Sequence, residues 1–137
     1  PLVGRQAGLL LADTTRYAEK QLFVAQCGVD PARIAAIGGI EARGVDLWAE
    51  RERVLDLLTE AGKNLLAADR VQVLLLGCLS FLGLAHPLSE RLGVPVVDPA
   101  VAPVALAECL VRQGLKTSRK AYPAPPLRKR TWQGGQL

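Results

Sequence analysis

Cysteine, histidine and methionine are scarce in this chain of 137 residues, and each shortage excludes a class of site. Three cysteines, an odd number without a Cys-x-x-Cys pair, argue against a disulfide framework or a zinc site and suit a reducing cytoplasm. His86 is the only histidine, so a catalytic pair has a single candidate base, and we expect a structural or solvated role for it. No signal-peptide pattern opens the chain. It begins with Pro1 and contains no methionine, so we expect a segment of something longer.

Long apolar runs and glycine-rich phosphate loops are also missing. No apolar run approaches the ~20 residues that a membrane span needs, so we expect no membrane segment. Neither Gly-x-x-x-x-Gly-Lys-Ser/Thr nor Gly-x-Gly-x-x-Gly occurs, which argues against a nucleotide-binding function. Half of the residues are apolar, enough for one domain with a real core, which excludes a disordered or fibrous chain.

Positive charge is concentrated at one end of the chain. Residues 1–108 hold 10 Lys and Arg against 13 Asp and Glu, whereas residues 109–137 hold 7 Lys and Arg and no acid. A basic tail can attract nucleic acid or an acidic membrane. Because no aromatic or glycine repeats interleave with these charges, we favour pairing with acids on this protein or on a neighbour. We therefore predict an extended basic tail over residues 115–137 and neither a nucleic-acid nor a membrane partner.

The stretch Val71–Ser80 organises the predicted fold. Its apolar part ends at Leu76 and is interrupted only by Gln72, which is typical of a buried central strand in a parallel sheet. Gly77 stops the strand and would let a ligand approach the backbone. Cys78 follows at the carboxyl end, where open α/β sheets bind ligands and a helix start can hold an anion or activate a thiol. The alternative is a cysteine that only packs as a small hydrophobe.

Strands and helices alternate along the first 114 residues. Strands are predicted at 7–12, 33–37, 71–76 and 94–97, and helices at about 15–26, 47–68, 83–92 and 100–113. This alternation predicts one α/β lobe, residues 1–114, built on a parallel, four-stranded, doubly wound, Rossmann-like sheet flanked by helices. In the first helix we expect Tyr17, Leu22 and Phe23 to face inward, with Val24 as a further candidate. Gly62 costs the second helix about 1 kcal/mol relative to alanine unless a close contact requires it.

Polar residues follow three of the predicted strands. Asp13–Thr15 follows the first strand, Cys78–Ser80 the third and Asp98 the fourth. Because the carboxyl ends of parallel strands meet at one edge, we expect these groups to converge, with Thr14, Thr15 and Asp98 as candidate substrate contacts. The alternative role of the threonines and of Asp98 is to cap the helix that follows.

Four stretches of the chain resemble the second half of the aspartate/glutamate/hydantoin racemase superfamily, especially its hydantoin and allantoin racemase branch. In order they are LVGRQAGLLLADTT, LLLGC, LGVPVVDP and LAECLVRQGLKTSRKAY. The resemblance implies a two-lobed isomerase whose lobes offer one cysteine each to opposite faces of a substrate carbon. One thiolate removes the proton next to a carbonyl and the other thiol returns a proton. No metal, pyridoxal or nicotinamide is needed, so we expect no cofactor.

Cys78 matches the cysteine of the family's second lobe. The first-lobe cysteine would lie upstream of this chain, and neither Cys27 nor Cys109 aligns with it. This fragment alone is therefore not expected to racemise anything. In the family the stretch after the cysteine is often Ala-Gly-Met, whereas here Leu79, Ser80 and Phe81 follow, which leaves the substrate open.

The resemblance also implies a substrate cradle. We expect the loop Gly77–Ser80, including Leu79, to form part of it together with Thr14 and Thr15, and Asp98 is a weaker candidate. The substrate would be a small molecule of the amino-acid or hydantoin type. Because lobed enzymes of this kind commonly self-associate, we expect a homo-oligomer.

Other functions stay open. One alternative is a decarboxylase or cis-trans isomerase of the same superfamily that works with a single cysteine. Another, of a different class, is a non-catalytic ligand-binding or assembly module whose basic tail contacts a partner.

Overall fold

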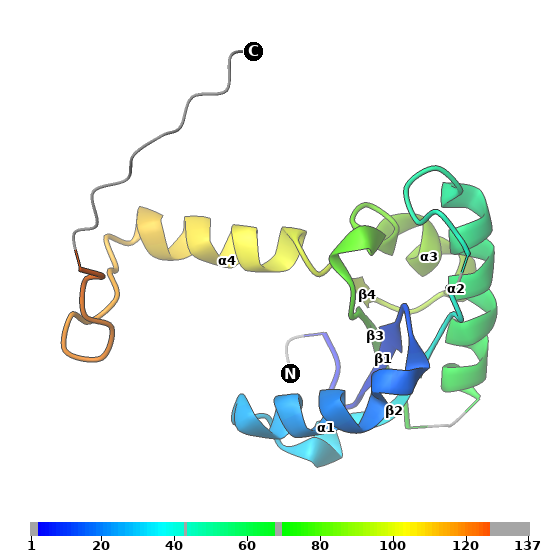
Figure 1. Ribbon diagram of the computed structural model, residues 1–137, viewed down its shortest axis with the longest axis horizontal. Helices are drawn as coiled ribbons and strands as arrows, with labels where there is room; N and C mark the ends of the chain where they lie inside the picture. Colours follow the sequence, from blue (N-terminus) through cyan, green and yellow to red (C-terminus); the bar gives the residue numbers. More distant parts are fainter. Residues whose placement is uncertain (1–2, 43, 68–69, 127–137) are drawn as a thin grey trace, which may run out of the picture. The chain divides into compact units, whose positions relative to one another are not determined.

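The computed structural model describes residues 3–42, 44–67 and 70–126 (Figure 1). Two compact units make up the chain, one ending at Ala105 and the other starting at Leu106. The first unit contains strands β1 (Ala7–Leu11), β2 (Ile34–Gly39), β3 (Val73–Leu76) and β4 (Val96–Val97), and helices α1 (Tyr17–Gln26), α2 (Arg51–Leu66) and α3 (Ala85–Leu92). Helix α4 (Val101–Arg112) begins in the first unit and ends in the second.

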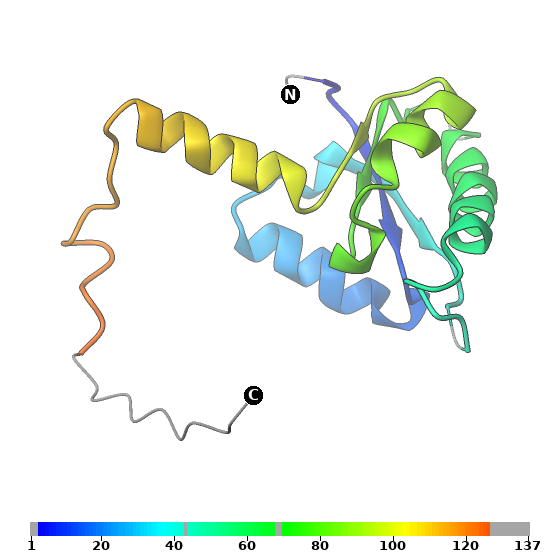
Figure 2. The same ribbon diagram turned by 90° about the horizontal axis from the view of Figure 1, so that it is seen from above.

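All four strands are parallel and lie in the order β2-β1-β3-β4. Helices α2 and α3 cover one face of the sheet, and α1 lies on the other face (Figures 1 and 2). Leu10 of β1 lies at the centre, paired with Gly38 of β2 and with Leu76 of β3. The predicted parallel, doubly wound sheet is therefore confirmed.

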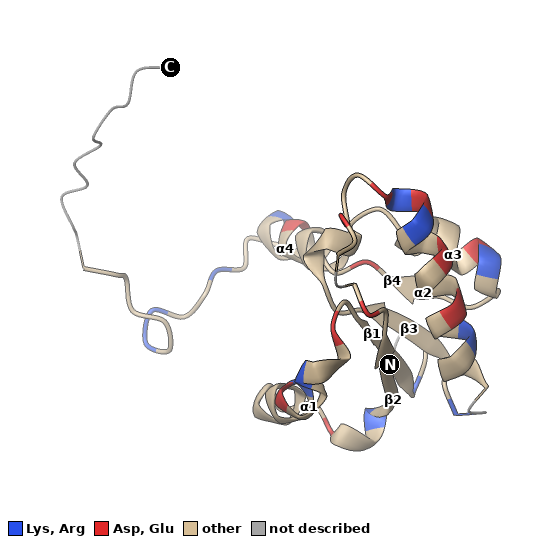
Figure 3. Cartoon of the chain, turned by 45° about the vertical axis from the view of Figure 1, so that its right-hand side comes forward, with Lys and Arg blue, Asp and Glu red and all other residues tan. Residues whose placement is uncertain are grey.

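The core lies between the sheet and helices α2 and α3. The largest fully buried aliphatic side chains come from both layers: Leu10, Val54, Leu58, Leu74 and Leu88. Charged residues of both signs alternate on the outer surfaces of α2 and α3 (Figure 3). One apolar and one charged face on each helix explain why the sequence predicts these two helices so clearly.

Gly62 is buried where α2 packs closely against side chains of α3 and β3. A Cβ at this position would lie 2.6 Å from Leu92 Cδ1 and 3.3 Å from Leu74 Cδ1. The close contact that a glycine inside this helix requires is therefore present.

Helix α1 does not bury the apolar residues that the sequence predicts. Tyr17 is 42% exposed, Leu22 60% and Phe23 58%, and no residue of α1 is buried among the described part of the chain. At about 100° of turn per residue, these three side chains point to three different sides of the helix. The expectation that they share an inward face was wrong for that reason.

Helix α2 begins later than the sequence predicts. Asp46 does act as a cap, since its Oδ1 accepts the N–H groups of Trp48 and Ala49 at 2.9 Å each, but it closes a separate turn. Glu50 accepts the N–H of Asp46 at 3.0 Å, and the helix then starts at Arg51. This extra turn places Arg51 in the first turn of α2, which matters for the site described below.

Helix α4 is mostly apolar, yet none of its residues is buried within the described chain. Gly114, with φ +70°, follows it as the sequence predicts. From there to residue 126 the described chain forms neither helix nor strand, and its charges are all positive: Lys116, Arg119 and Lys120 (Figure 3). Over the ranges that the structure describes, no helix is both long enough and apolar enough to span a membrane.

Candidate functional site

The end of β3 is packed tightly against β1. Gly77 N–H donates to the carbonyl oxygen of Leu10 at 2.7 Å. A Cβ on Gly77 would lie 2.8 Å from Leu11 Cδ2 and 3.0 Å from Leu10 O. The space that a side chain would need is thus filled by β1, so the glycine is required by the sheet and its N–H is used there.

Cys78 is half-buried and extended, with φ −137° and ψ 132°, directly before the 3-10 turn Leu79–Phe81. The turn begins with a hydrogen bond of 3.0 Å from Phe81 N–H to Cys78 O. Phe81 is fully buried and anchors the turn, whereas Leu79 is 66% exposed. Because the first N–H groups of a helical turn have no acceptor within it, those of Leu79 and Ser80, directly after Cys78, have no partner inside the turn.

Two charged side chains from other elements hold this loop. Arg51 donates from Nη1 to Ser80 O at 2.8 Å and from Nη2 to Leu82 O. Asp98 Oδ2 accepts the N–H of Gly83 at 2.8 Å. The segment from Cys78 to Gly83 is therefore fixed by both a cation and an anion.

Asp98 is 8% exposed, and its other oxygen caps the start of α4. Oδ1 accepts the N–H groups of Ala100 at 2.8 Å and of Val101 at 3.0 Å. Burial opposes ionisation of Asp98, but the three N–H donors and the nearby Arg51 guanidinium outweigh it and hold the pKa of this carboxyl below its ordinary value of 3.8. The capping role named as the alternative is thus present, and Asp98 also borders a groove of about 550 Å³ next to α3 and β4.

The segment after β1 carries a second polar cluster. Asp13 Oδ1 accepts the N–H of Thr15 at 2.9 Å and its hydroxyl at 2.6 Å, so Asp13, rather than a threonine, caps the turn that follows β1. The hydroxyl of Thr14 donates to Glu41, which follows β2. Asp13 and Glu41 also line a hollow of about 250 Å³ together with Ala12 and Ala42. The sequence analysis did not identify Glu41, because this residue lies between a predicted strand and a predicted helix, in a stretch with no motif.

The sheet order decides which of the predicted groups lie near one another. β3 pairs with both β1 and β4, so the segments that follow these three strands emerge at one carboxyl edge. Asp13–Thr15, Cys78–Ser80 and Asp98 thus follow neighbouring strands. No group of three or more His, Cys, Asp or Glu side chains arranged for a metal ion occurs in the described ranges.

His86 and the two other cysteines, Cys27 and Cys109, are exposed. His86 is on α3, where its side chain is 86% exposed and lies 3.6 Å from Glu90, so a solvated role fits. Cys27 caps the far end of α1, a helix that starts next to Thr14–Arg16, and at about 1.5 Å of rise per residue the helix carries it some 15 Å away. Cys109 lies on α4, where its sulfur accepts a hydrogen bond of 3.1 Å from Gln113 Nε2. Of the three thiols, only Cys78 follows a strand at the carboxyl edge.

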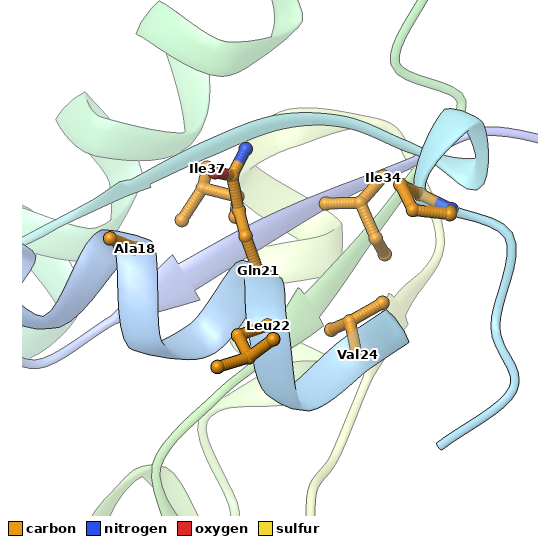
Figure 4. A pocket seen from close by; sticks show the side chains of 7 residues that line it. Ala18, Gln21, Leu22, Val24, Ile34 and Ile37 are labelled. Carbon is orange, nitrogen blue, oxygen red and sulfur yellow. The ribbon is translucent and has the colours of Figure 1, made fainter. Parts of the chain in front are cut away.

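A separate apolar groove of about 420 Å³ lies between α1 and β2 (Figure 4). Leu22 and Val24 line it from the helix, and Ile34 and Ile37 line it from the strand. None of the predicted site residues contributes to it. Because Leu22 lines this groove, its side chain borders open space on the side of α1 that faces β2.

Comparison with known proteins places these observations in a family. Residues 8–107 match the family model for Asp/Glu/Hydantoin racemase. The chain is 39% identical over 84 residues to a hydantoin racemase of Paenarthrobacter aurescens, which covers 60% of this chain and 36% of the relative. It is 38% identical over 82 residues to a hydantoin racemase of Pseudomonas sp. (strain NS671), which covers 59% of this chain and 33% of that protein.

Two solved structures have the same fold. The allantoin racemase from Klebsiella pneumoniae superposes with a TM-score of 0.80 at 24% identity, over 96% of this chain and 54% of that one. The allantoin racemase from Pseudomonas fluorescens superposes with a TM-score of 0.75 at 25% identity, over 95% of this chain and 55% of that one. The chain thus matches about a third of the curated relatives and about half of the solved chains.

Proposed function

The chain belongs to the Asp/Glu/hydantoin racemase family, and from this premise we propose that the protein carrying it is a racemase or epimerase. The substrate class that the relatives support is a hydantoin-like or amino-acid-like small molecule with an acidic C–H next to a carbonyl. The proposal needs no cofactor, because thiol and thiolate groups suffice to move such a proton.

The observation that carries this proposal is the position of Cys78. Its half-buried thiol stands at the carboxyl end of a central strand, at the start of a turn whose first N–H groups have no partner inside the turn. A carbonyl oxygen held by the N–H groups of Leu79 and Ser80 would be stabilised as negative charge develops on it. The same position therefore offers an acid/base group and donors for the enolate oxygen.

The reaction balances with two acid/base groups. A thiolate on one face takes the proton from carbon, and the C–H electron pair moves toward the carbonyl oxygen to form an enolate. A thiol on the other face then donates its proton to carbon and becomes the thiolate for the next turnover. In this proposal Cys78 is one of the two groups, and the second comes from outside these 137 residues.

Substrate contacts are assigned to the side chains and N–H groups at the carboxyl edge. Thr14 and Thr15 are proposed to contact the polar groups of the substrate, beside the N–H groups of Leu79 and Ser80. Gly77 and Asp98 already use their polar groups on the backbone, so they shape the loop in this proposal rather than bind substrate.

The exposed apolar residues of α4 and the unpaired cysteines support two coarser proposals. Side chains such as Leu106 and Val111, 61% and 74% exposed, indicate that α4 packs against another part of the protein or a second copy, consistent with a homo-oligomer. Three free cysteines support a reducing compartment, the cytoplasm.

A single-cysteine reaction is the second candidate function. It is favoured by the observation that only one of the three thiols follows a strand at the carboxyl edge. In a decarboxylase of this family type, Cys78 would protonate the carbanion that remains after carbon dioxide leaves.

The decisive experiment follows a chiral 5-substituted hydantoin in deuterium oxide with the whole protein that carries this sequence. Racemisation with deuterium uptake at carbon, lowered about 10²- to 10⁴-fold by Cys78→Ala and unchanged by Cys27→Ala, supports the proposal. Release of carbon dioxide from a disubstituted malonate without racemisation supports the decarboxylase instead. An unchanged rate in Cys78→Ala contradicts both.

A further inference from the structure

Arg51 reaches from the first turn of α2 to the loop that follows β3. Each of its two terminal nitrogens donates a hydrogen bond to one carbonyl oxygen of this loop, Nη1 to Ser80 O at 2.8 Å and Nη2 to Leu82 O. The aromatic ring of Trp48 lies 5.3 Å from the guanidinium carbon and covers it. A planar fork that bridges two carbonyls restricts both distance and orientation, which a single point charge cannot do.

The stability of α2 itself does not explain this arginine. A cation in the first turn of a helix faces the positive end of the helix dipole and is unfavourable there. The charge that suits this end of α2 is that of the N-cap residue Glu50, and Glu50 pairs with Arg53 at 2.7 Å rather than with Arg51. The contacts of Arg51 instead serve carbonyls that are 29 and 31 positions away in the sequence.

Holding these carbonyls orients the opposite end of the turn. In a helical turn the carbonyl groups point forward along the axis and the N–H groups point back. Arg51 therefore acts as a C-terminal cap on the turn Leu79–Phe81, and it fixes the direction of the N–H groups that start the turn beside Cys78. Asp98 restrains the segment just beyond, through the N–H of Gly83 at 2.8 Å.

We propose that Arg51 is a positioning residue for the reaction of Cys78. By bridging Ser80 O and Leu82 O, it keeps the thiol and the N–H groups of Leu79 and Ser80 aligned on one substrate. The inference rests on the proposed function, because it assumes that these N–H groups hold an anionic oxygen. If Arg51 only stabilised the fold, its loss would change the stability alone. If it positions the loop, its loss should also lower the reactivity of Cys78 toward an anionic reagent relative to a neutral one.

Alkylation of Cys78 tests this without relying on turnover. The full chain with Cys27→Ser and Cys109→Ser is treated with iodoacetate, which carries a carboxylate, and with the neutral iodoacetamide. The ratio of the two rate constants should fall about 10-fold in Arg51→Met, the size of one lost charge-assisted hydrogen bond. Arg53→Met removes an arginine from the same helix without touching the loop, and it should leave the ratio unchanged.

Turnover by the whole protein gives the second readout. Arg51→Met should lower kcat by about 10²-fold with little change in KM, as expected for a displaced loop, and Arg51→Lys should restore part of it. A fallen alkylation ratio in a protein that does not racemise would reject the proposed function and keep only the orientation of the Cys78 loop by Arg51. Racemisation with an unchanged kcat and ratio in Arg51→Met would reject Arg51 and keep the function.

Circular dichroism shows whether each Arg51 variant is folded and gives its melting temperature. If Arg51→Met does not fold, Arg51→Lys becomes the deciding variant, because it keeps the charge and loses the fork. A lower ratio and kcat at an unchanged melting temperature in Arg51→Lys supports the positioning role, and wild-type values for both overturn it.

Discussion

Arg51 and Asp98 hold the same short loop through complementary atoms. The guanidinium of Arg51 donates to the carbonyl oxygens of Ser80 and Leu82, and the carboxylate of Asp98 accepts the N–H of Gly83. The two residues also interact electrostatically, since the positive charge of the Arg51 guanidinium helps to lower the pKa of the Asp98 carboxyl. The loop that carries Cys78 is thus fixed by residues from two different elements, α2 and the end of β4.

The first prediction concerns Asp98 and pH. Asp98→Asn should lower the free energy of unfolding at pH 7 by about 1–3 kcal/mol. The asparagine has only one accepting oxygen, so its NH2 group would face at least one backbone N–H that the carboxylate of Asp98 accepts. The pKa of Asp98 is lowered on folding, so its stabilising contribution is present above the ordinary value of 3.8 and is lost as the pH falls through the folded value. Urea unfolding at pH 7 and pH 3 measures both effects.

Asp56→Asn is the matched control for this prediction. The side chain of Asp56 is 69% exposed and pairs with Arg91 at the surface, so its loss should change the stability by less than about 1 kcal/mol. A stability gap between Asp98→Asn and the wild type that stays equally large at pH 3 would contradict the proposed role of the Asp98 charge.

The second prediction compares two neighbouring glycines at the end of β2. A Cβ on Gly39 would lie 2.3 Å from the backbone oxygen of Leu11, whereas a Cβ on Gly38 would meet the end of the Leu65 side chain at 3.1 Å. Backbone cannot move aside as a leucine side chain does. Gly39→Ala should therefore destabilise the protein by about 1–3 kcal/mol or more, and Gly38→Ala by less, as measured by thermal melting. Equal losses in the two variants would show that β1 and β2 separate easily.

The third prediction uses two aspartates that cap similar turns at opposite edges of the sheet. Asp13 follows β1 and accepts the N–H of Thr15, and Asp30 precedes β2 and accepts the N–H of Ala32, each at 2.9 Å. Asp13→Ala and Asp30→Ala should each cost about 1 kcal/mol of stability. Only Asp13→Ala should raise KM for the racemised substrate, because only that cap orients the candidate contacts Thr14 and Thr15. A similar rise in KM for Asp30→Ala would mean that KM simply follows stability.

The strands show which parts of the structure can be predicted from the sequence. Val73–Leu76 and Ala7–Leu11 are short apolar runs ended by polar or glycine residues, and both are strands in the structure, starting within two residues of the prediction. Because parallel strands place their carboxyl ends together, the alternation of strands and helices is enough to assign the segments containing Thr14, Cys78 and Asp98 to one edge. Periodicity and strand order therefore account for the fold and for most of the candidate site.

Arg51 and Glu41 show what the sequence leaves out. Arg51 lies in a run of alternating charges that predicts a water-facing helix surface, and nothing local indicates that it bridges carbonyls near residue 81. Glu41 lies in a stretch without periodicity, and its hydrogen bond with Thr14 spans 27 positions. Both are tertiary contacts of single side chains, which propensity and spacing do not encode.

The last prediction separates anchoring from substrate contact within one turn. Phe81 is fully buried and Leu79 is 66% exposed, although only Ser80 lies between them. Phe81→Ala should cost about 3–5 kcal/mol of unfolding free energy, because it leaves a cavity under the turn. Leu79→Ala removes almost no buried area and should change the stability by less than about 0.5 kcal/mol. Because the proposed function places the substrate at the N–H group of Leu79, the exposed Leu79 side chain should border it, and Leu79→Ala should change the ratio of kcat/KM between hydantoins with small and large side chains, measured by polarimetry. An identical preference in Leu79→Ala and the wild type would place the substrate elsewhere on this edge of the sheet.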